Sequence, residues 1–287
     1  MKIAFIGQKG IPAKSGGVER HVEELSVKLA EKGHEVFVYA RNNYTEKNIN
    51  EYKKVKLVHL SSVSTKHLDA IIHTFLATIH AIFQKYDVIH YHSIGPSSLC
   101  FLIKIFKRKT TLIATYHCQD YFHKKWGFIA KAYLKFGEFV ISKVPDKTIV
   151  VTNIIKSFVK NKYNCDAVVI PNGMNVKKIN QFGKVKERWN LGKDEYILTV
   201  GRLIKHKGVH YLIEAYKKLE DNNLTQGKKL VVVGDGFYTD DYVEKLKQLA
   251  GGRENIIFTG DQQGEVLKEL FSNAYLFVQS SESEDCQ

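Results

Sequence analysis

A strand-to-helix turn in the last third of the chain holds the residues best suited to bind a phosphate group. Arg202 and Lys207 are five residues apart in Gly201-Arg-Leu-Ile-Lys-His-Lys-Gly208. A guanidinium offers a planar fork of donors and an ammonium a compact charge, so the two can converge on one diphosphate. A solvated basic loop is the alternative interpretation, because such loops have the same composition.

Glycines dominate the first loop of the chain, from Gly7 to Gly17, which follows a short apolar run. Without a Cβ in the way, backbone N–H groups can approach an anion closely, and the start of the following helix adds favourable partial charge. The loop is therefore a candidate anion site, with a plain flexible loop as the alternative. It lacks the GxGxxG pattern, which disfavours a nicotinamide-dependent dehydrogenase.

Histidines gather around two predicted strands, at residues 88–91 and 111–115. His117 and Asp120 follow the second strand, and ligands bind at the carboxyl ends of strands in open α/β sheets. His90 and His92 alternate along the first strand, so their side chains share a face. Because no third ligand lies near these two histidines in the sequence, we predict no metal site.

Acidic residues follow the last predicted strand, in Glu282-Ser-Glu-Asp285. A carboxylate just beyond the end of a strand can accept hydrogen bonds from sugar hydroxyl groups. A frayed acidic terminus is the alternative interpretation of the same residues. This segment is therefore a candidate sugar site only if the neighbouring motifs also point to a sugar.

The middle of the chain combines positive charge with aromatic residues. Lysines and aromatic residues alternate between positions 124 and 139, at Lys124, Lys125, Trp126, Phe128, Lys131, Lys135, Phe136 and Phe139. A basic helix with aromatic residues on its other face can lie on an anionic bilayer surface. A solvated face above an ordinary core is the alternative.

The excess of positive charge is confined to the first part of the chain. There are 43 basic and 30 acidic residues, a formal net charge of +13. Residues 1–172 hold 26 basic and 13 acidic residues, and residues 173–287 hold 17 of each. This asymmetry predicts an anionic partner, either a membrane, a nucleic acid or a phosphorylated substrate. No nucleic-acid recognition motif accompanies the charge, so we expect no nucleic-acid partner.

Short apolar runs alternate with amphipathic segments along the sequence. Strands are predicted at 2–6, 35–40, 55–60, 88–91, 111–115, 147–151 and 168–170, with helices notably at 66–85 and 128–143. After the turn Pro171-Asn-Gly173 the alternation restarts, with strands at 196–201, 229–234, 255–259 and 274–279. This order predicts an α/β protein with two doubly wound parallel sheets, in domains 1–172 and 173–287.

The cysteines and the apolar runs indicate the compartment. The four cysteines form no CxxC pair, which is typical of free thiols in a reducing cytosol. The longest uncharged runs, 70–84 and 88–103, are shorter than a membrane-spanning helix requires. We therefore expect a cytoplasmic protein that is soluble or peripheral on the inner face of the plasma membrane.

Several motifs together resemble GT-B glycosyltransferases of family 4, especially the rhamnosyl- or mannosyltransferase-like members that build bacterial surface polysaccharides. The resemblance covers nearly the whole chain and implies two Rossmann-like domains facing each other across a cleft. The motifs are Gly10-Ile-Pro-Ala-Lys-Ser-Gly-Gly-Val-Glu19, Gly33-His-Glu-Val36, His90-Tyr-His-Ser-Ile-Gly-Pro96, Tyr116-His-Cys-Gln-Asp120, Lys125-Trp126, Ile170-Pro-Asn-Gly173, Gly201-Arg-Leu-Ile-Lys-His-Lys-Gly208 and Gly234-Asp-Gly236.

The resemblance implies transfer of a hexose, with retention at the anomeric carbon, from a UDP- or GDP-type sugar donor to a glycan or lipid-linked acceptor. It implies that no metal is required. Arg202 and Lys207 would hold the diphosphate and stabilise the charge that develops as it leaves. His117 would contact the donor sugar near the reacting centre. Glu284 would bind hydroxyl groups of the donor sugar.

On the acceptor side, the resemblance implies further contacts. Gly16 and Gly17 would pack their backbone against the donor phosphate or the acceptor, and Glu19 and Asp120 would lie near the acceptor. An anionic membrane surface is expected as a partner, because the acceptor is expected to be lipid-linked.

The sequence departs from the family pattern at its end. The family has a Glu-x7-Glu motif whose second Glu holds the ribose, whereas this sequence reads Glu284-Asp-Cys-Gln287 and stops. We therefore expect an incomplete second domain, apolar surface exposed beside it, and impaired transfer. The alternative function is a non-catalytic scaffold that binds a nucleotide or another polyanion.

Overall fold

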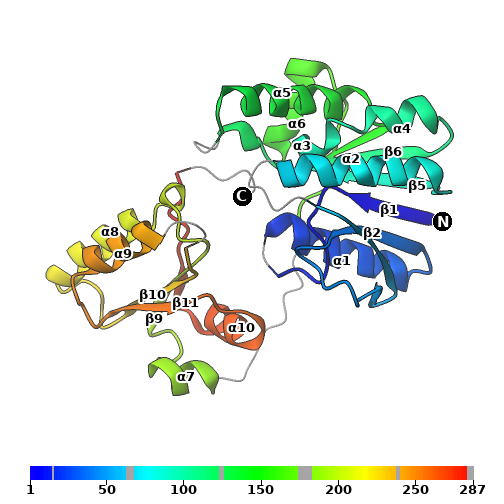
Figure 1. Ribbon diagram of the computed structural model, residues 1–287. Helices are drawn as coiled ribbons and strands as arrows, with labels where there is room; N and C mark the ends of the chain where they lie inside the picture. Colours follow the sequence, from blue (N-terminus) through cyan, green and yellow to red (C-terminus); the bar gives the residue numbers. More distant parts are fainter. Residues whose placement is uncertain (15, 63–67, 123–125, 174–182, 237–239, 283–287) are drawn as a thin grey trace. The chain divides into compact units, whose positions relative to one another are not determined.

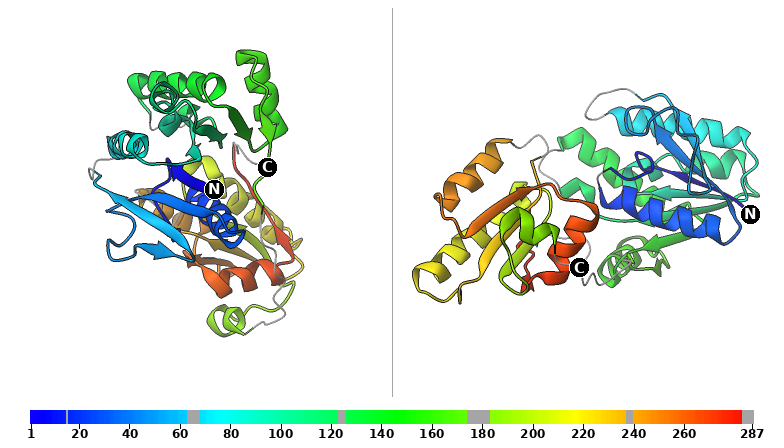
Figure 2. Two further views of the ribbon diagram at one scale, coloured as in Figure 1. Left: turned by 90° about the vertical axis from the view of Figure 1, so that its right-hand side faces the viewer. Right: turned by 90° about the horizontal axis from the view of Figure 1, so that it is seen from below.

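The chain forms two compact α/β units, residues 1–173 and residues 174–284. The computed structural model describes residues 1–287 except 15, 63–67, 123–125, 174–182, 237–239 and 283–287. Each unit has its own largely parallel sheet with helices on both faces (Figure 1, Figure 2). The α/β class predicted from the sequence is therefore confirmed.

An eight-stranded sheet forms the centre of the N-terminal unit, in the order β3-β4-β2-β1-β5-β6-β7-β8. Neighbouring strands pair in parallel except β3 and β4. The strands are β1 (Lys2–Ile6), β2 (Glu35–Arg41), β3 (Glu51–Tyr52), β4 (Val55–Leu60), β5 (Val88–His92), β6 (Thr111–Tyr116), β7 (Lys147–Val150) and β8 (Val168–Val169). This order places the carboxyl ends of β1, β5 and β6 side by side.

The central strand β1 is apolar from Ile3 to Ile6 because both faces of its sheet are covered. Ile3 and Phe5 belong to the buried cluster that also contains Val22 of α1, whereas Ala4 and Ile6 belong to the cluster on the opposite face. The helical segments of this unit are α1 (Gly17–Glu31), α2 (Leu68–Phe83), α3 (Ile94–Ser97), α4 (Phe101–Phe106), η1 (Asp120–Phe122), α5 (Phe128–Lys143) and α6 (Asn153–Tyr163).

The C-terminal unit has a four-stranded parallel sheet in the order β11-β10-β9-β12. Residues of β10 alternate between two buried clusters, one shared with α8 and α9 and one shared with α7 and α10. The elements are α7 (Lys184–Trp189), β9 (Tyr196–Val200), η2 (Lys205–Lys207), α8 (Val209–Asp221), β10 (Lys229–Val233), α9 (Asp240–Ala250), β11 (Ile256–Gly260), α10 (Gly264–Asn273) and β12 (Leu276–Phe277).

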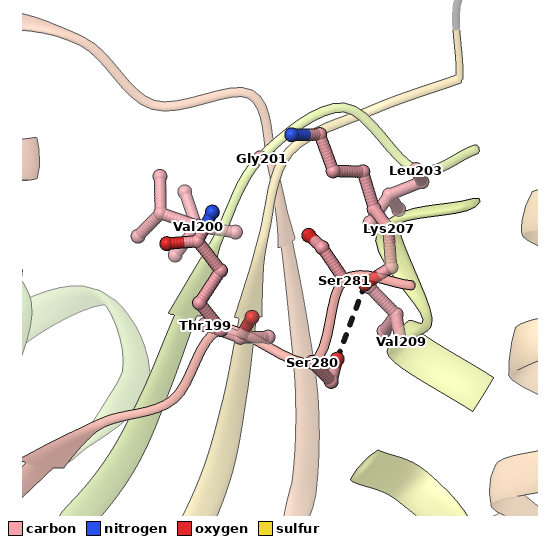
Figure 3. Close-up of a pocket in the computed structure, with 10 residues that line it drawn as sticks. Thr199, Val200, Gly201, Leu203, Lys207, Val209, Ser280 and Ser281 are labelled. Atoms are coloured by element: carbon pink, nitrogen blue, oxygen red, sulfur yellow. Dashed lines mark hydrogen bonds between the residues drawn. The ribbon is translucent and has the colours of Figure 1, made fainter. Parts of the chain in front are cut away.

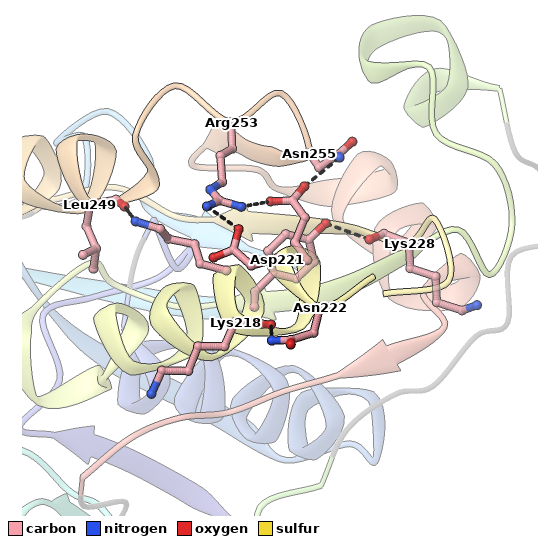
Figure 4. Close-up of polar contacts among 10 residues, drawn as sticks. Lys218, Asp221, Asn222, Lys228, Leu249, Arg253 and Asn255 are labelled. Atoms are coloured by element: carbon pink, nitrogen blue, oxygen red, sulfur yellow. Dashed lines mark hydrogen bonds and ion pairs between the residues drawn. The ribbon is translucent and has the colours of Figure 1, made fainter. Parts of the chain in front are cut away.

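A group of polar contacts anchors the end of α8, the helix that begins after the basic turn (Figure 4). Arg253 forms ion pairs with Glu220 at 2.6 Å and with Asp221 at 2.7 Å. Asn255 donates a further hydrogen bond to Glu220 at 2.7 Å. Because Arg253 and Asn255 lie between α9 and β11, these contacts tie three elements together and help fix the position of α8.

Candidate functional site

A pocket lies at the carboxyl ends of β9 and β10 in the C-terminal unit, beside the start of α8 (Figure 3). Open α/β sheets bind ligands at this end of their strands, where helix N-termini also point. The pocket is lined by Thr199, Val200, Gly201, Leu203, Lys207, Val209, Val233, Gln279, Ser280 and Ser281.

Lys207 lines this pocket from the short helix η2, and the chain around it is tightly packed. Gly208 follows with a φ of +64°, a left-handed conformation that favours glycine and opens α8. Any Cβ at Gly208 would overlap the carbonyl oxygen of Ser280. The Ser280 hydroxyl in turn donates to the carbonyl oxygen of Lys207 at 3.2 Å. These contacts hold the backbone of Lys207 against the loop after β12.

The other predicted donor-site residues are placed differently. Arg202 belongs to the same turn, between the lining residues Gly201 and Leu203, but its side chain is exposed and does not line the pocket. Glu284 lies outside the described residues. Of the predicted donor-site side chains of the C-terminal unit that the structure describes, only Lys207 therefore reaches the pocket (Figure 3).

Four histidines form a second candidate site, at the carboxyl ends of β5 and β6 in the N-terminal unit. His92 Nδ1 lies 3.0 Å from His117 Nε2. The His21 ring, from α1, packs edge-on against His117 with ring centroids 4.9 Å apart. His90 packs against His92 at a centroid distance of 4.2 Å, and its Nε2 lies 2.7 Å from Thr115 Oγ1.

Burial keeps these imidazoles neutral. Desolvation, with a smaller contribution from neighbouring histidines, lowers the pKa of His90 and of His117 to about 3. Desolvation also places the pKa of His92 well below its ordinary value, with help from His90 and His117. The pKa of His21 is lowered mainly by burial, against a hydrogen bond with Asn172 that raises it.

Three of these histidines have the donor atoms that a metal ion would need. One nitrogen from each of His21, His92 and His117 lies within 4.8 Å of the others, and neutral imidazole is the form that binds metals. Sequence reasoning considered His90 and His92 and missed His21, which is far from both in the sequence. Pairing of β1 with β5, and of β5 with β6, brings the three together.

The glycine-rich loop is held by two carboxylates of α1. Glu19, which is 8% exposed, accepts a hydrogen bond from the Lys9 backbone N–H at 3.3 Å. Glu23 accepts one from the Ala13 backbone N–H at 2.8 Å. Gly16 has a φ of +99°, and a Cβ there would overlap the Glu19 carboxylate. The structure therefore gives Glu19 a role in shaping the loop, beside its predicted place near the acceptor.

The remaining predicted positions lie around the same end of the N-terminal sheet. Gly17 begins α1, and a Cβ added to it would meet no atom within 4 Å. Asp120 begins η1, three residues after His117, and accepts a hydrogen bond from Cys118 Sγ at 3.1 Å. Gly7 follows β1 and lies so close to the end of β5 that a Cβ would overlap the carbonyl oxygen of His92.

The aromatic residues of α5 are exposed. Phe128 and Ile129 are 88% and 85% exposed, and Phe136 and Phe139 about half exposed, at 49% and 48%. Lys135 lies on the same outward face, because residues three and four apart are neighbours on a helix. The interpretation of a solvated face above an ordinary core is therefore wrong for these aromatic residues. Lys124 and Lys125 lie outside the described residues.

Among the described residues, no helix is both long enough and apolar enough to cross a membrane.

Comparison with known proteins identifies the family. The profile of Glycosyltransferase Family 4 matches residues 15–178, and that of Glycosyl transferases group 1 matches residues 181–286. Alpha-monoglucosyldiacylglycerol synthase of Streptococcus pneumoniae is 26% identical, over 99% of this chain and 67% of its own length.

Solved structures share the fold. Sucrose-phosphate synthase from Thermosynechococcus elongatus matches with a TM-score of 0.79 and 20% identity, over 100% of this chain and 77% of its own. Anabaena HepE, solved in complex with UDP and glucose, matches with a TM-score of 0.74 and 17% identity, over 99% of this chain and 75% of its own. The chain therefore belongs to Glycosyltransferase Family 4 and is a GT-B glycosyltransferase.

Proposed function

We propose that this glycosyltransferase transfers a hexose from a nucleotide diphosphate sugar, with retention at the anomeric carbon, to a lipid-linked or glycan acceptor in cell-surface polysaccharide synthesis. The observation that carries the proposal is the pocket at the carboxyl ends of β9 and β10, lined by Lys207 at the start of α8. An ammonium group together with the N-terminus of a helix suits a diphosphate.

In this proposal the protein's own charges stabilise the leaving diphosphate, so no metal is required. Lys207 supplies charge from within the pocket, and Arg202, exposed on the same turn, supplies a second cation. Positive groups placed where negative charge develops lower the barrier to bond cleavage. The complex of HepE with UDP and glucose supports a UDP-type donor, and a GDP-type donor is the alternative within the proposal.

The exposed face of α5 supports a lipid-linked acceptor. Phe128 and Ile129 can enter the apolar boundary of a bilayer while Lys131 and Lys135 meet anionic headgroups. The name of the pneumococcal relative, a monoglucosyldiacylglycerol synthase, also points to a lipid product. We place the protein at the inner face of the plasma membrane, where sugar nucleotides and lipid acceptors meet.

A transfer assay tests this function. The purified chain is incubated with radiolabelled UDP- and GDP-hexoses and with membrane lipids as acceptors, and the products are separated by solvent extraction. The proposal predicts label in the lipid or glycan fraction from one donor class, and an α-linked product from an α-linked donor. Nucleotide binding without transfer under any condition would instead support the non-catalytic scaffold.

A further inference from the structure

A fully buried carboxylate joins three elements of the N-terminal unit. Glu138 belongs to α5 and its side chain has no exposed surface. Its Oε2 accepts a hydrogen bond at 2.6 Å from the hydroxyl of Tyr116, the last residue of β6. Its Oε1 accepts two bonds from the end of α6, one from the Tyr163 hydroxyl at 2.6 Å and one from Lys162 Nζ at 2.7 Å. One side chain therefore ties α5 to β6 and to α6.

These bonds keep the carboxylate charged inside the unit. Desolvation by itself would raise the pKa of Glu138, but hydrogen bonds from Lys162 and from tyrosine hydroxyl groups outweigh it and lower the pKa. An ionised carboxylate accepts hydrogen bonds at both oxygens and donates none. Glu138 therefore fixes where its donors can lie, because each of them must point a hydrogen at one of two oxygens.

A second tyrosine brings the same carboxylate to the other end of a site segment. Tyr121 belongs to η1 and is buried, and its hydroxyl is also hydrogen-bonded to Glu138. Gln119 Nε2 donates to this hydroxyl at 2.6 Å. Residues 117–120, which include two of the predicted site residues, lie between Tyr116 and Tyr121. Glu138 therefore contacts the residue before this segment and the residue after it.

Stability alone does not account for a charged group at this place. Removing a carboxylate from water is costly, and apolar residues of similar volume often stabilise a core as well or better. A buried polar group whose hydrogen bonds are all made adds a defined geometry, because its partners are held in fixed directions. Residues 117–119 belong to no helix or strand, so the course of the chain there depends on contacts of this kind.

We propose that Glu138 is a positioning residue, which holds segment 117–120 at the carboxyl end of β6 through Tyr116 on one side and Tyr121 on the other. The consequence for sugar transfer rests on the proposed function, in which His117 contacts the donor sugar near the reacting centre. Misplacing such a contact by about 1 Å can lower the rate about 100-fold. Loss of the Glu138 contacts should therefore lower kcat, while the affinity for UDP or GDP, which carry no sugar, should stay nearly unchanged.

Two matched variants separate positioning from core stability. Tyr116→Phe and Tyr163→Phe each delete one hydroxyl group that bonds to Glu138 at 2.6 Å. Only Tyr116 adjoins segment 117–120, whereas Tyr163 is the last residue of α6. Glu138→Gln, which keeps the shape of the side chain and removes its charge, is measured beside them. If that variant fails to fold, the two tyrosine variants still decide the question, because each removes a single oxygen atom.

Backbone NMR of the chain without nucleotide gives the first measurement. Amide order parameters of about 0.85 mark rigid backbone, and values below about 0.6 mark flexible backbone. The order parameters of Cys118 and Gln119 should fall in Tyr116→Phe and in Glu138→Gln. In Tyr163→Phe they should keep the values of the unmodified chain. Because no substrate is present, this result does not depend on whether the chain transfers sugar.

Transfer kinetics give the second measurement, at a temperature where urea titration shows each variant to be folded. Tyr116→Phe should lower kcat about tenfold, the effect of losing one hydrogen bond to a charged group, and Tyr163→Phe should leave it unchanged. Equal order parameters at Cys118 and Gln119 in the two tyrosine variants, or equal kcat values, would overturn the inference. If the unmodified chain transfers no sugar, the proposed function fails, and the NMR comparison still decides whether Glu138 holds the segment.

Discussion

Gly208 packs directly against the carbonyl oxygen of Ser280, so that the turn carrying Lys207 and the loop after β12 share one backbone contact. The contact joins two segments that are far apart in the sequence, on two sides of the pocket. It requires the absence of a side chain at position 208 and a left-handed backbone there, and only glycine meets both conditions easily.

Gly208→Ala should destabilise the C-terminal unit. A left-handed backbone costs an alanine about 1–2 kcal/mol, and forcing a methyl group into a packed position adds about 1–3 kcal/mol. Gly227→Ala is the matched control, because Gly227 has a φ of +75° but open space around its Cβ. Urea unfolding should show a larger decrease in the free energy of unfolding for Gly208→Ala than for Gly227→Ala. Equal decreases would mean that the contact with Ser280 contributes nothing to stability.

Stability of the N-terminal unit should fall as the pH falls below 6.5. The pKa of His90 is lowered to about 3 in the folded chain by burial, from an ordinary value of 6.5. The unfolded chain therefore binds a proton that the folded chain refuses. Each such histidine removes about 1.4 kcal/mol of stability per pH unit between these two values, and its contribution is fully present above pH 6.5.

Comparison with His90→Gln isolates this effect from that of the carboxylates, because glutamine does not titrate and can keep a hydrogen bond to Thr115. The two tryptophans, Trp126 and Trp189, lie one in each unit, so a Trp189→Phe background reports on the N-terminal unit alone. Between pH 6.5 and 5 the stability should fall less steeply in the variant. Parallel curves would show that His90 is not held neutral by the fold.

Binding to anionic vesicles should depend on the outward face of α5. Replacing Phe128 and Ile129 with serine should weaken binding on the order of tenfold for each residue, since each would otherwise bury a large apolar side chain. Neutralising Lys131 and Lys135 should reduce the free energy of vesicle binding by about 1 kcal/mol for each lysine, and by less at high salt.

Ile154→Ser is the control for that experiment, because Ile154 is 79% exposed but belongs to α6 and not to α5. Vesicle sedimentation at matched lipid concentration measures each variant. Equal binding of the unmodified chain to neutral and anionic vesicles would contradict the membrane surface assigned to α5.

The periodic parts of the fold could be predicted from the sequence. The run from Lys2 to Ile6 forms β1, and the helix predicted at 128–143 is α5. Helices α3 and α4 have 4 and 6 residues, which is too short for a 3.6-residue period to appear. The strand predicted at 274–279 is paired only at Leu276–Phe277, because pairing depends on the neighbouring strand and not on β propensity alone.

The candidate sites were less predictable, because they depend on contacts between distant segments. The strand order places α1, which carries His21, near the end of β5, which carries His92. Because strand–helix–strand connections are right-handed, the position of the first helix beside the neighbouring strand could have been predicted, and with it the contact between these two histidines. The exposure of Phe128 and Phe136 could not be predicted from composition, since aromatic residues on a helix ordinarily face a core.

Isothermal titration with UDP and GDP measures whether the pocket lined by Lys207 binds a nucleotide diphosphate. We predict saturable binding of one nucleotide. Lys207→Ala should weaken the affinity for that nucleotide about 10- to 100-fold. Lys205→Ala should change the affinity little, because Lys205 belongs to the same turn but its exposed side chain lies outside this pocket. Absence of binding by both nucleotides, or equal affinity in Lys207→Ala and the unmodified chain, would show that Lys207 does not line a nucleotide site.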